Sequence, residues 1–241
     1  MTDELSNEVE VQSNNEDAAL SELIDVLRQR SATYMFLSRL YRKEIDQELL
    51  DELHGRLYPA ENVDEDLYTG NLYIATYLSN LWSGSLNELR IDFSRCFFGQ
   101  GVDGYSAAYP FESVYTSEKR LMMEAARNEV LAIYRAYGVE KKPTWKEEED
   151  HISLELEFVQ IMCEKTIKAL LDGNPSRAQE LLSAQTGFIE DHLLAWVPML
   201  LADMRRFAKT KLYLGLTYLT WGFLKTDFYF LRDLLSDSND A

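Results

Sequence analysis

The chain has 241 residues, 46% of them hydrophobic, with only 11 Gly and 5 Pro. This is enough apolar material for one large or two small folded domains, which excludes a chain that is disordered throughout. The formal net charge of −17 argues against nucleic acid as a partner, because phosphates need a positive surface, and favours a basic peptide.

The first 17 residues are predicted to form a disordered acidic tail. They contain six acids and no Lys or Arg, a composition typical of disordered segments. They also lack the positive and apolar regions of a secretory signal peptide. The longest uncharged apolar stretch, 212–224, is too short to span a bilayer. We therefore expect a cytoplasmic protein without stable membrane insertion.

The remaining chain is predicted to be an all-α helical bundle. Apolar residues recur at intervals of three and four, as on one face of a helix, and strand-like alternation is absent. The pattern indicates about nine to eleven helices. The predicted ranges, in chain order, are about 19–41, 46–57, 63–82, 86–97, 117–137, 151–172, 176–186, 188–208 and 210–234.

Several helix ends carry recognisable signals. Ser85 and Glu88 have the spacing of a capping box. Gly138 and Gly173 follow periodic runs, as glycines at helix C-termini do. The dipeptide 174–175, Asn-Pro, is typical of an N-cap followed by a first-turn proline.

A polar stretch with Pro143 and the charge run 146–150 separates two helical blocks and is the predicted hinge. Two helical subdomains joined by this hinge are therefore expected. The predicted divisions are a tail at 1–17, an N-terminal subdomain at 18–138, the hinge at 139–149, a C-terminal subdomain at 150–235 and a tail at 236–241.

The sequence shows no constellation of catalytic or metal-binding residues. Cys96 and Cys163 stand alone, so neither a disulfide framework nor a zinc site is indicated, and buried reduced thiols are expected. The stretch 99–104 matches GxGxxG but follows a helix and not a strand, so it is interpreted as a flexible loop. Glu148 and His151 have metal-ligand spacing, but a di-iron site needs a second such pair and further glutamates. We expect no enzyme activity, no metal and no cofactor.

The acidic run 147–150 before His151 has two interpretations. It can be a helix start, with Asp150 as N-cap, the acids facing the positive helix end, and His151 making a weak surface pair with Glu155 one turn later. It can also be part of a carboxylate metal motif through Glu148 and His151, the interpretation set aside above.

An aromatic loop precedes this run. It contains Phe97, Phe98, Tyr105, Tyr109, Phe111 and Tyr115 together with Pro110 and Glu112. Connections are normally polar, so this loop either packs into the core or presents a surface to a peptide that is both apolar and basic.

Four segments together resemble the TorD/DmsD family of redox-enzyme maturation chaperones. One departure is Glu148, which stands where the family's acidic motif usually has proline. The resemblance covers about residues 20–234, and the ordered set is more specific than any single motif. The segments are DFSRCFFG at 92–99, YPFESVY at 109–115, EEEDH at 147–151 ahead of LELEF at 154–158, and FIEDHL at 188–193 with Trp196.

The resemblance implies an all-helical cytoplasmic chaperone that binds the twin-arginine signal peptide of a molybdenum-cofactor oxidoreductase precursor, and often its apo form, and delays export until the cofactor is inserted. Its acids would meet the arginines of the leader, and its aromatic residues the apolar part. The predicted peptide-binding residues are Glu147, Asp150, His151, Phe93, Phe97, Tyr109, Pro110, Phe111, Glu112 and Tyr115.

Two alternatives stay open. The protein can be an assembly scaffold for a nitrate-reductase-like complex, binding the enzyme body and not the leader, or a weak nucleotide-binding protein. The sequence also leaves open which enzyme is the client, and whether the chain is a monomer or a homodimer that exchanges helices.

Overall fold

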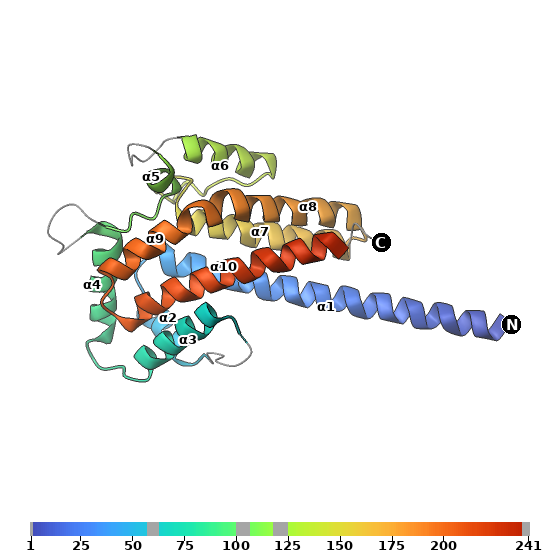
Figure 1. Ribbon diagram of the computed structural model, residues 1–241, viewed down its shortest axis with the longest axis horizontal. Helices are drawn as coiled ribbons and strands as arrows, with labels where there is room; N and C mark the ends of the chain where they lie inside the picture. The colour runs from blue at the N-terminus through green and yellow to red at the C-terminus, as the bar shows by residue number, and fades with distance from the viewer. Residues whose placement is uncertain (1, 57–62, 100–106, 118–124, 238–241) are drawn as a thin grey trace.

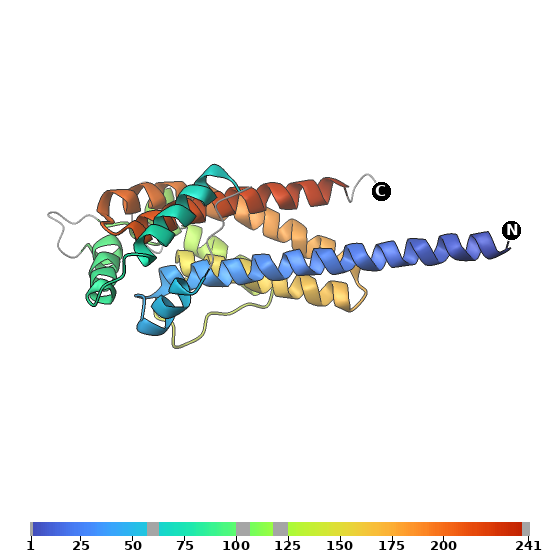
Figure 2. The same ribbon diagram turned by 90° about the horizontal axis from the view of Figure 1, so that it is seen from below.

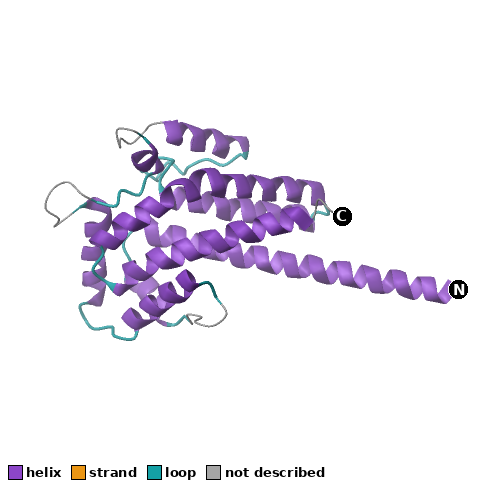
Figure 3. Cartoon of the chain, in the orientation of Figure 1, coloured by secondary structure: helices purple, strands orange, loops and turns teal. Residues whose placement is uncertain are grey.

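The computed structural model describes residues 2–56, 63–99, 107–117 and 125–237 (Figure 1). Over these residues the chain is mainly helical and contains no strand (Figure 3), which confirms the all-α prediction. The helices are α1 Thr2–Arg42, α2 Gln47–His54, α3 Glu65–Leu78, α4 Ser85–Phe98, α5 Glu112–Thr116, α6 Ala125–Ala136, α7 Ile152–Leu171, α8 Pro175–Phe188, the π-helical turn η1 Ile189–Leu193, α9 Leu194–Phe207 and α10 Lys211–Asp237.

Helix α1 is longer than the sequence analysis predicted. It begins at Thr2, so the segment 2–17 is helical where a disordered tail was expected. No Gly or Pro interrupts residues 2–42, and acids near a helix N-terminus are favoured by the helix dipole. The N-terminal part of α1 projects beyond the rest of the bundle (Figure 2).

The two halves of the chain are interleaved. Helix α1 packs along α7, and α3 packs along α10, so each of these contacts joins an early helix to a late one (Figure 1). One buried apolar cluster contains residues from both predicted subdomains. The buried ion pair between Arg30 Nε and Asp227 Oδ1, 2.5 Å, joins α1 to α10 within this core. The division into two subdomains stays a prediction, and the shared core does not follow it.

Helices α3 and α10 approach closely because both carry glycine at the crossing. A Cβ added to Gly215 would lie 2.8 Å from the carbonyl oxygen of Gly70, and one added to Gly70 would lie 2.6 Å from the backbone nitrogen of Leu219. Neither position has room for a side chain without movement of backbone, so the contact depends on both glycines.

Asp92 of α4 caps helix α10 from a distance. Its side chain is fully buried and accepts hydrogen bonds from the N–H groups of Lys209 and Thr210, at 2.7 to 3.0 Å, and from the Thr210 hydroxyl. Arg95 pairs with the same carboxylate at 2.7 Å. Asp92, the first residue of the segment 92–99, therefore stabilises the turn between α9 and α10.

The helix ends confirm three of the four sequence signals. Gly138 and Gly173 have φ of 65° and 70°, and Asn174 caps α8 by accepting from the N–H of Arg177 at 3.0 Å. The capping box at Ser85 is wrong, because Gly84 is the N-cap of α4 and no side chain caps that end. Ser85 is already the first helical residue, and its hydroxyl accepts from the N–H of Trp82.

Candidate functional site

The segments 109–115 and 147–151, which the sequence analysis singled out, meet in a short antiparallel pairing. The N–H of Glu112 donates to the carbonyl of Asp150 at 3.0 Å, and the N–H of Ile152 donates to the carbonyl of Pro110 at 2.9 Å. Phe111 and His151 form the bridge between these bonds. The pairing therefore fixes the points at which α5 and α7 begin.

Asp150 lies inside the protein and does not cap α7. Its side chain is fully buried, and Oδ2 accepts from the N–H of Ser113 at 2.9 Å, in the first turn of α5. The prediction that Asp150 is the N-cap of the following helix is wrong. The reason is that the chain is still paired with 110–112 at this residue, so α7 begins one residue later than that interpretation requires.

His151 takes the capping role. Its Nδ1 accepts from the N–H of Ser153 at 3.1 Å, which places the ring proton on Nε2. Burial, with a contribution from the charge of Arg42, lowers the pKa of His151 to about 3. The ring is therefore neutral and packs edge-on against Phe111 and Trp145, with centroid distances of 5.1 and 5.6 Å.

A buried carboxyl cluster lies behind the pairing. Glu112 is 4% exposed, and its Oε2 lies 3.0 Å from Nδ1 of His192 in the π-helical turn η1. Glu155 is fully buried and accepts from the indole N–H of Trp196 at 3.0 Å. Burial first, and then the neighbouring carboxylates Glu112 and Asp150, raise the pKa of Glu155 well above its ordinary value.

Burial and the neighbouring carboxylates therefore favour the neutral, protonated form of Glu155. The sequence analysis expected Glu155 to form a weak surface pair with His151, and this was wrong. The cluster joins α5, α7, η1 and α9 through polar contacts in the interior, where a hydrogen bond is difficult to replace.

The acids of the hinge differ in their exposure. Glu147 is exposed, whereas Glu148 and Glu149 are ion-paired with Arg127 of α6 at 2.6 and 2.8 Å. Lys141 lies 3.1 Å from Oε1 of Glu149 and donates to the backbone carbonyl of Glu147 at 2.5 Å. The hinge thus presents the exposed carboxylates of Glu140 and Glu147 beside two that are already ion-paired within the chain.

The candidate aromatic residues are mostly interior. Phe93 and Phe97 are buried and lie 4.8 Å apart between ring centroids, and Phe111 is 6% exposed. Tyr115 is half-buried and stacks on Trp196 with a centroid distance of 5.7 Å. Of the predicted site aromatics, Tyr109 is 36% exposed. Pro110 is buried, Phe98 at the end of α4 is 62% exposed, and Tyr105 lies outside the described residues. The described part of this loop therefore mainly packs into the core.

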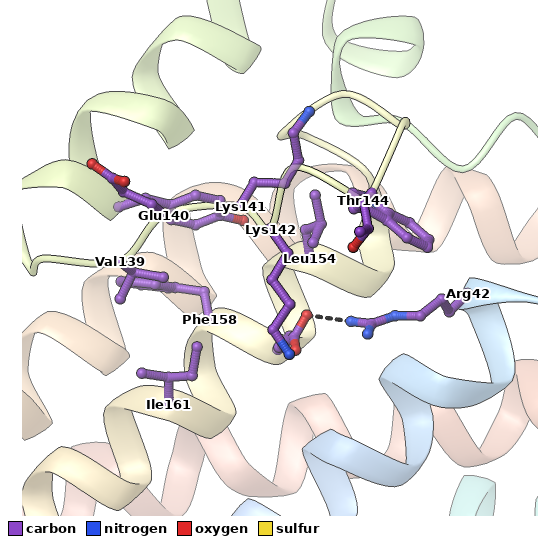
Figure 4. Close-up of a pocket in the computed structure, with 12 residues that line it drawn as sticks. Arg42, Val139, Glu140, Lys141, Lys142, Thr144, Leu154, Phe158 and Ile161 are labelled. Carbon is purple, nitrogen blue, oxygen red and sulfur yellow. Dashed lines mark hydrogen bonds and ion pairs between the residues drawn. The ribbon is translucent and has the colours of Figure 1, made fainter.

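An apolar hollow of about 180 Å³ lies between the hinge and α7 (Figure 4). Its rim carries charges of both signs, from Glu140, Lys141 and Lys142. Arg42 lies over the ring of Trp145 at 5.0 Å and pairs with Glu157. Val139, Leu154, Phe158 and Ile161 are among the residues that form its apolar lining. A second hollow, of about 560 Å³ and lined by α1, α2 and α7, shares Arg42 and Glu157 with the first.

Sequence reasoning missed Glu155, His192 and Trp196 as partners of the predicted site. A signal for Glu155 was present, because Ile152, Glu155, Val159 and Met162 follow helical spacing and place the acid on an apolar stripe. Arg127 gave no such signal, since its pairing depends on how α6 lies over the hinge.

Among the described residues, no group of three or more His, Cys, Asp or Glu side chains could hold a metal ion. Over the same residues, no helix has the length and apolar character needed to cross a membrane. Cys96 and Cys163 are both free and buried, as expected.

The fold and site define a helical protein in which the start of α7 is paired with the buried segment 110–112. The family model described as nitrate reductase delta subunit matches residues 60–202, more than half of the chain. The chain therefore belongs to this family.

Relatives carrying the name chaperone protein TorD cover most of the chain. One from Vibrio cholerae serotype O1 (El Tor Inaba N16961) is 26% identical over 226 residues, which is 91% of this chain and 100% of the relative. One from Photobacterium profundum is 26% identical over 187 residues, 74% of this chain and 83% of the relative. One from Aliivibrio fischeri is 26% identical over 234 residues, 88% of this chain and 99% of the relative. The resemblance to TorD-type chaperones is thereby confirmed.

Proposed function

We propose that the protein is a non-enzymatic, cytoplasmic maturation chaperone for a molybdenum-cofactor oxidoreductase. It binds the twin-arginine leader of the precursor, the apo-enzyme or both, assists cofactor insertion and delays export. The relatives named chaperone protein TorD support the chaperone class. The leader as ligand is supported by the exposed acids Glu140 and Glu147 of the hinge, a segment that also lines an apolar hollow.

The acids suit the arginines of the leader. Glu147 is exposed and Glu148 is partly so, and carboxylates bind guanidinium groups through strong, charge-assisted hydrogen bonds. The net charge of −17 adds a long-range attraction for a basic peptide.

The hollow suits the apolar part of the leader. Its lining is largely apolar and its charged rim is mixed, with Glu140 and Glu157 beside Arg42, Lys141 and Lys142, so an apolar side chain fits the lining better than a charged one. The hinge thus offers acids for the basic part of one peptide and an apolar hollow for its apolar part. Tyr109 adds a half-exposed aromatic surface on the neighbouring segment.

Asp150 and His151 act indirectly in this proposal. Both are buried, Asp150 accepts from the Ser113 N–H and His151 packs on Phe111, so they hold the start of α7 against the segment 110–113. Phe93, Phe97, Phe111 and Glu112 support the same surface from inside.

The proposal is tested by titrating a labelled synthetic twin-arginine leader into the full-length protein and recording fluorescence anisotropy. Binding should weaken as salt rises, because exposed ion pairs are screened over about 8 Å at physiological ionic strength. A leader with both arginines changed to glutamine should bind much less. Glu147→Gln should lower the affinity about two- to five-fold, the range of one partly exposed ion pair.

Glu48→Gln is the matched control. Glu48 is an exposed acid on α2 with no ion pair among the described residues, so this variant changes the net charge equally without touching the hinge. Equal affinity of the two leaders for the parent protein would reject an arginine-directed site.

The family description, nitrate reductase delta subunit, favours a second candidate, an assembly scaffold that binds the enzyme body. Binding of a leaderless apo-enzyme as tightly as the full precursor, with no binding of the isolated leader, would select this alternative.

A further inference from the structure

Arg127 of α6 forms ion pairs with two acids of the hinge, so the chain itself supplies a guanidinium group at this site. Its Nε lies 2.6 Å from Oε2 of Glu148 and 2.8 Å from Oε2 of Glu149. The three side chains are 28%, 18% and 10% exposed, in the order Arg127, Glu148, Glu149. The ion pairs are therefore partly shielded from water, which strengthens them, and a ligand at the surface can still reach them.

The charges of this group favour its ionised, paired form. Burial opposes the charged form of Arg127, but Glu149 and Glu148 raise its pKa overall. Burial also opposes ionisation of Glu149, and its bond to Lys141 with the charge of Arg127 lowers its pKa. Two adjacent carboxylates repel each other, and Arg127 offsets this repulsion at Glu148 and Glu149 while Lys141 offsets it at Glu149 alone.

Helix α6, which carries Arg127, is lightly attached. Its buried side chains in the described range are Ala126, Val130 and Tyr134, and it lies at the outer edge of the bundle beside α5 (Figure 1). Elements with few buried apolar contacts are the ones that open most easily. The ion pairs to Glu148 and Glu149 are therefore a substantial part of what holds the start of α6 to the hinge.

We propose that Arg127 is an internal competitor for the hinge acids, which an arginine of the bound partner displaces. The inference rests on the proposed function and adds a regulatory step to the same site. The exchange replaces one guanidinium with another, so Glu148 and Glu149 are never left unpaired. A partner without arginine offers no such replacement. Displacing Arg127 would then leave Glu148 without a cation, which lowers the affinity for that partner. Release of the start of α6 accompanies binding.

The test compares Arg127→Gln with Arg135→Gln in the full-length protein. Arg135 lies on the same helix, is exposed and has no ion pair in the described structure, so both variants lose one positive charge near the hinge. Removing the competitor should tighten binding of the twin-arginine leader by about two- to five-fold relative to Arg135→Gln, the equivalent of one partly exposed ion pair. Arg127→Lys, which keeps a cation, should bind close to the parent.

A second readout is hydrogen exchange of the backbone amides in 125–136. Leader binding should speed exchange there in the parent, whereas Arg127→Gln should exchange faster already without leader. The amides of α3 serve as the internal reference, because this helix packs on α10, away from α6.

The outcomes separate the two proposals. If the parent binds the leader, but Arg127→Gln binds no more tightly than Arg135→Gln, the competitor role is wrong and the proposed function stands. If neither the parent nor a folded Arg127→Gln binds the leader, the proposed function fails and the inference falls with it. Circular dichroism of each variant establishes that it is folded.

Discussion

The indole N–H of Trp196 donates to Oε2 of Glu155 at 3.0 Å, and both side chains are fully buried. The pair joins α9 to the first turn of α7 and lies directly behind the pairing of 110–112 with 150–152. The hinge and its partner segment are thus anchored to the interior by polar groups, which need specific partners, and not by apolar packing alone.

Trp196→Phe should destabilise the protein by at least about 1–3 kcal/mol, because the buried Glu155 loses its donor and the smaller phenyl ring packs less of the core. The measurement is the free energy of unfolding in urea. Trp82→Phe is the control, since Trp82 is 65% exposed and its loss should have little effect. Equal unfolding midpoints for both variants would mean that the hydrogen bond adds nothing to stability.

His151 should make the protein acid-sensitive. Its pKa is about 3 in the folded state against an ordinary 6.5, so between these values the unfolded chain binds more protons. Stability should therefore fall as the pH drops from 6.5 toward 3, by up to about 1.4 kcal/mol per pH unit from this group. His151→Asn keeps an acceptor for the Ser153 N–H, and its stability should depend less on pH.

The control for this prediction is His54→Asn. His54 is exposed on α2, so its replacement should leave the pH profile of urea unfolding unchanged. A parent and His151→Asn with parallel profiles from pH 6.5 down toward 3 would show that His151 is protonated in the folded protein.

Gly215→Ala should lower the melting temperature. Its Cβ would lie 2.8 Å from the Gly70 carbonyl, so α3 and α10 must move apart. Gly187→Ala, in α8, should instead raise stability by about 0.5–1 kcal/mol, because no atom lies within 4 Å of the new Cβ and alanine favours helix. In thermal melts, the melting temperature should fall for Gly215→Ala and rise for Gly187→Ala, and a change in the same direction for both would contradict the prediction.

Asp150→Asn should bind the leader within about two-fold of the parent, because the side chain is interior and its amide oxygen can still accept from the Ser113 N–H. Loss of its charge also removes a repulsion on Glu155. A drop of roughly ten-fold or more at unchanged melting temperature would instead place a leader arginine on Asp150, which requires the segment 110–113 to leave the hinge.

The helix positions were predictable because apolar spacing reports directly which face is buried. Helix α5 was missed because Glu112–Thr116 is too short to have a period and is fixed by Asp150 from another part of the chain. The start of α1 was not predictable from composition, because acidic segments are often disordered, whereas the absence of Gly and Pro in 2–42 lets the helix continue.

The candidate site was predictable as segments and not as contacts. The sequence indicated that 109–115 and 147–151 belong together, through their resemblance to a family. It did not indicate that Asp150 and His151 face inward. Which of two adjacent polar residues becomes the N-cap depends on which one pairs with the segment 110–112, and that pairing is tertiary. The cations that pair with Glu148 and Glu149 come from α6 and the hinge, and tertiary packing alone brings them there.

The interleaving of early and late helices has a consequence for synthesis. During translation, the apolar face of α3 is covered only after α10 has been synthesised, and the apolar face of α1 only after α7. The nascent N-terminal half therefore exposes Leu27, Leu37 and Ile74, which are buried in the finished protein. A chaperone of this architecture would itself be open to misassembly until its last helix has left the ribosome.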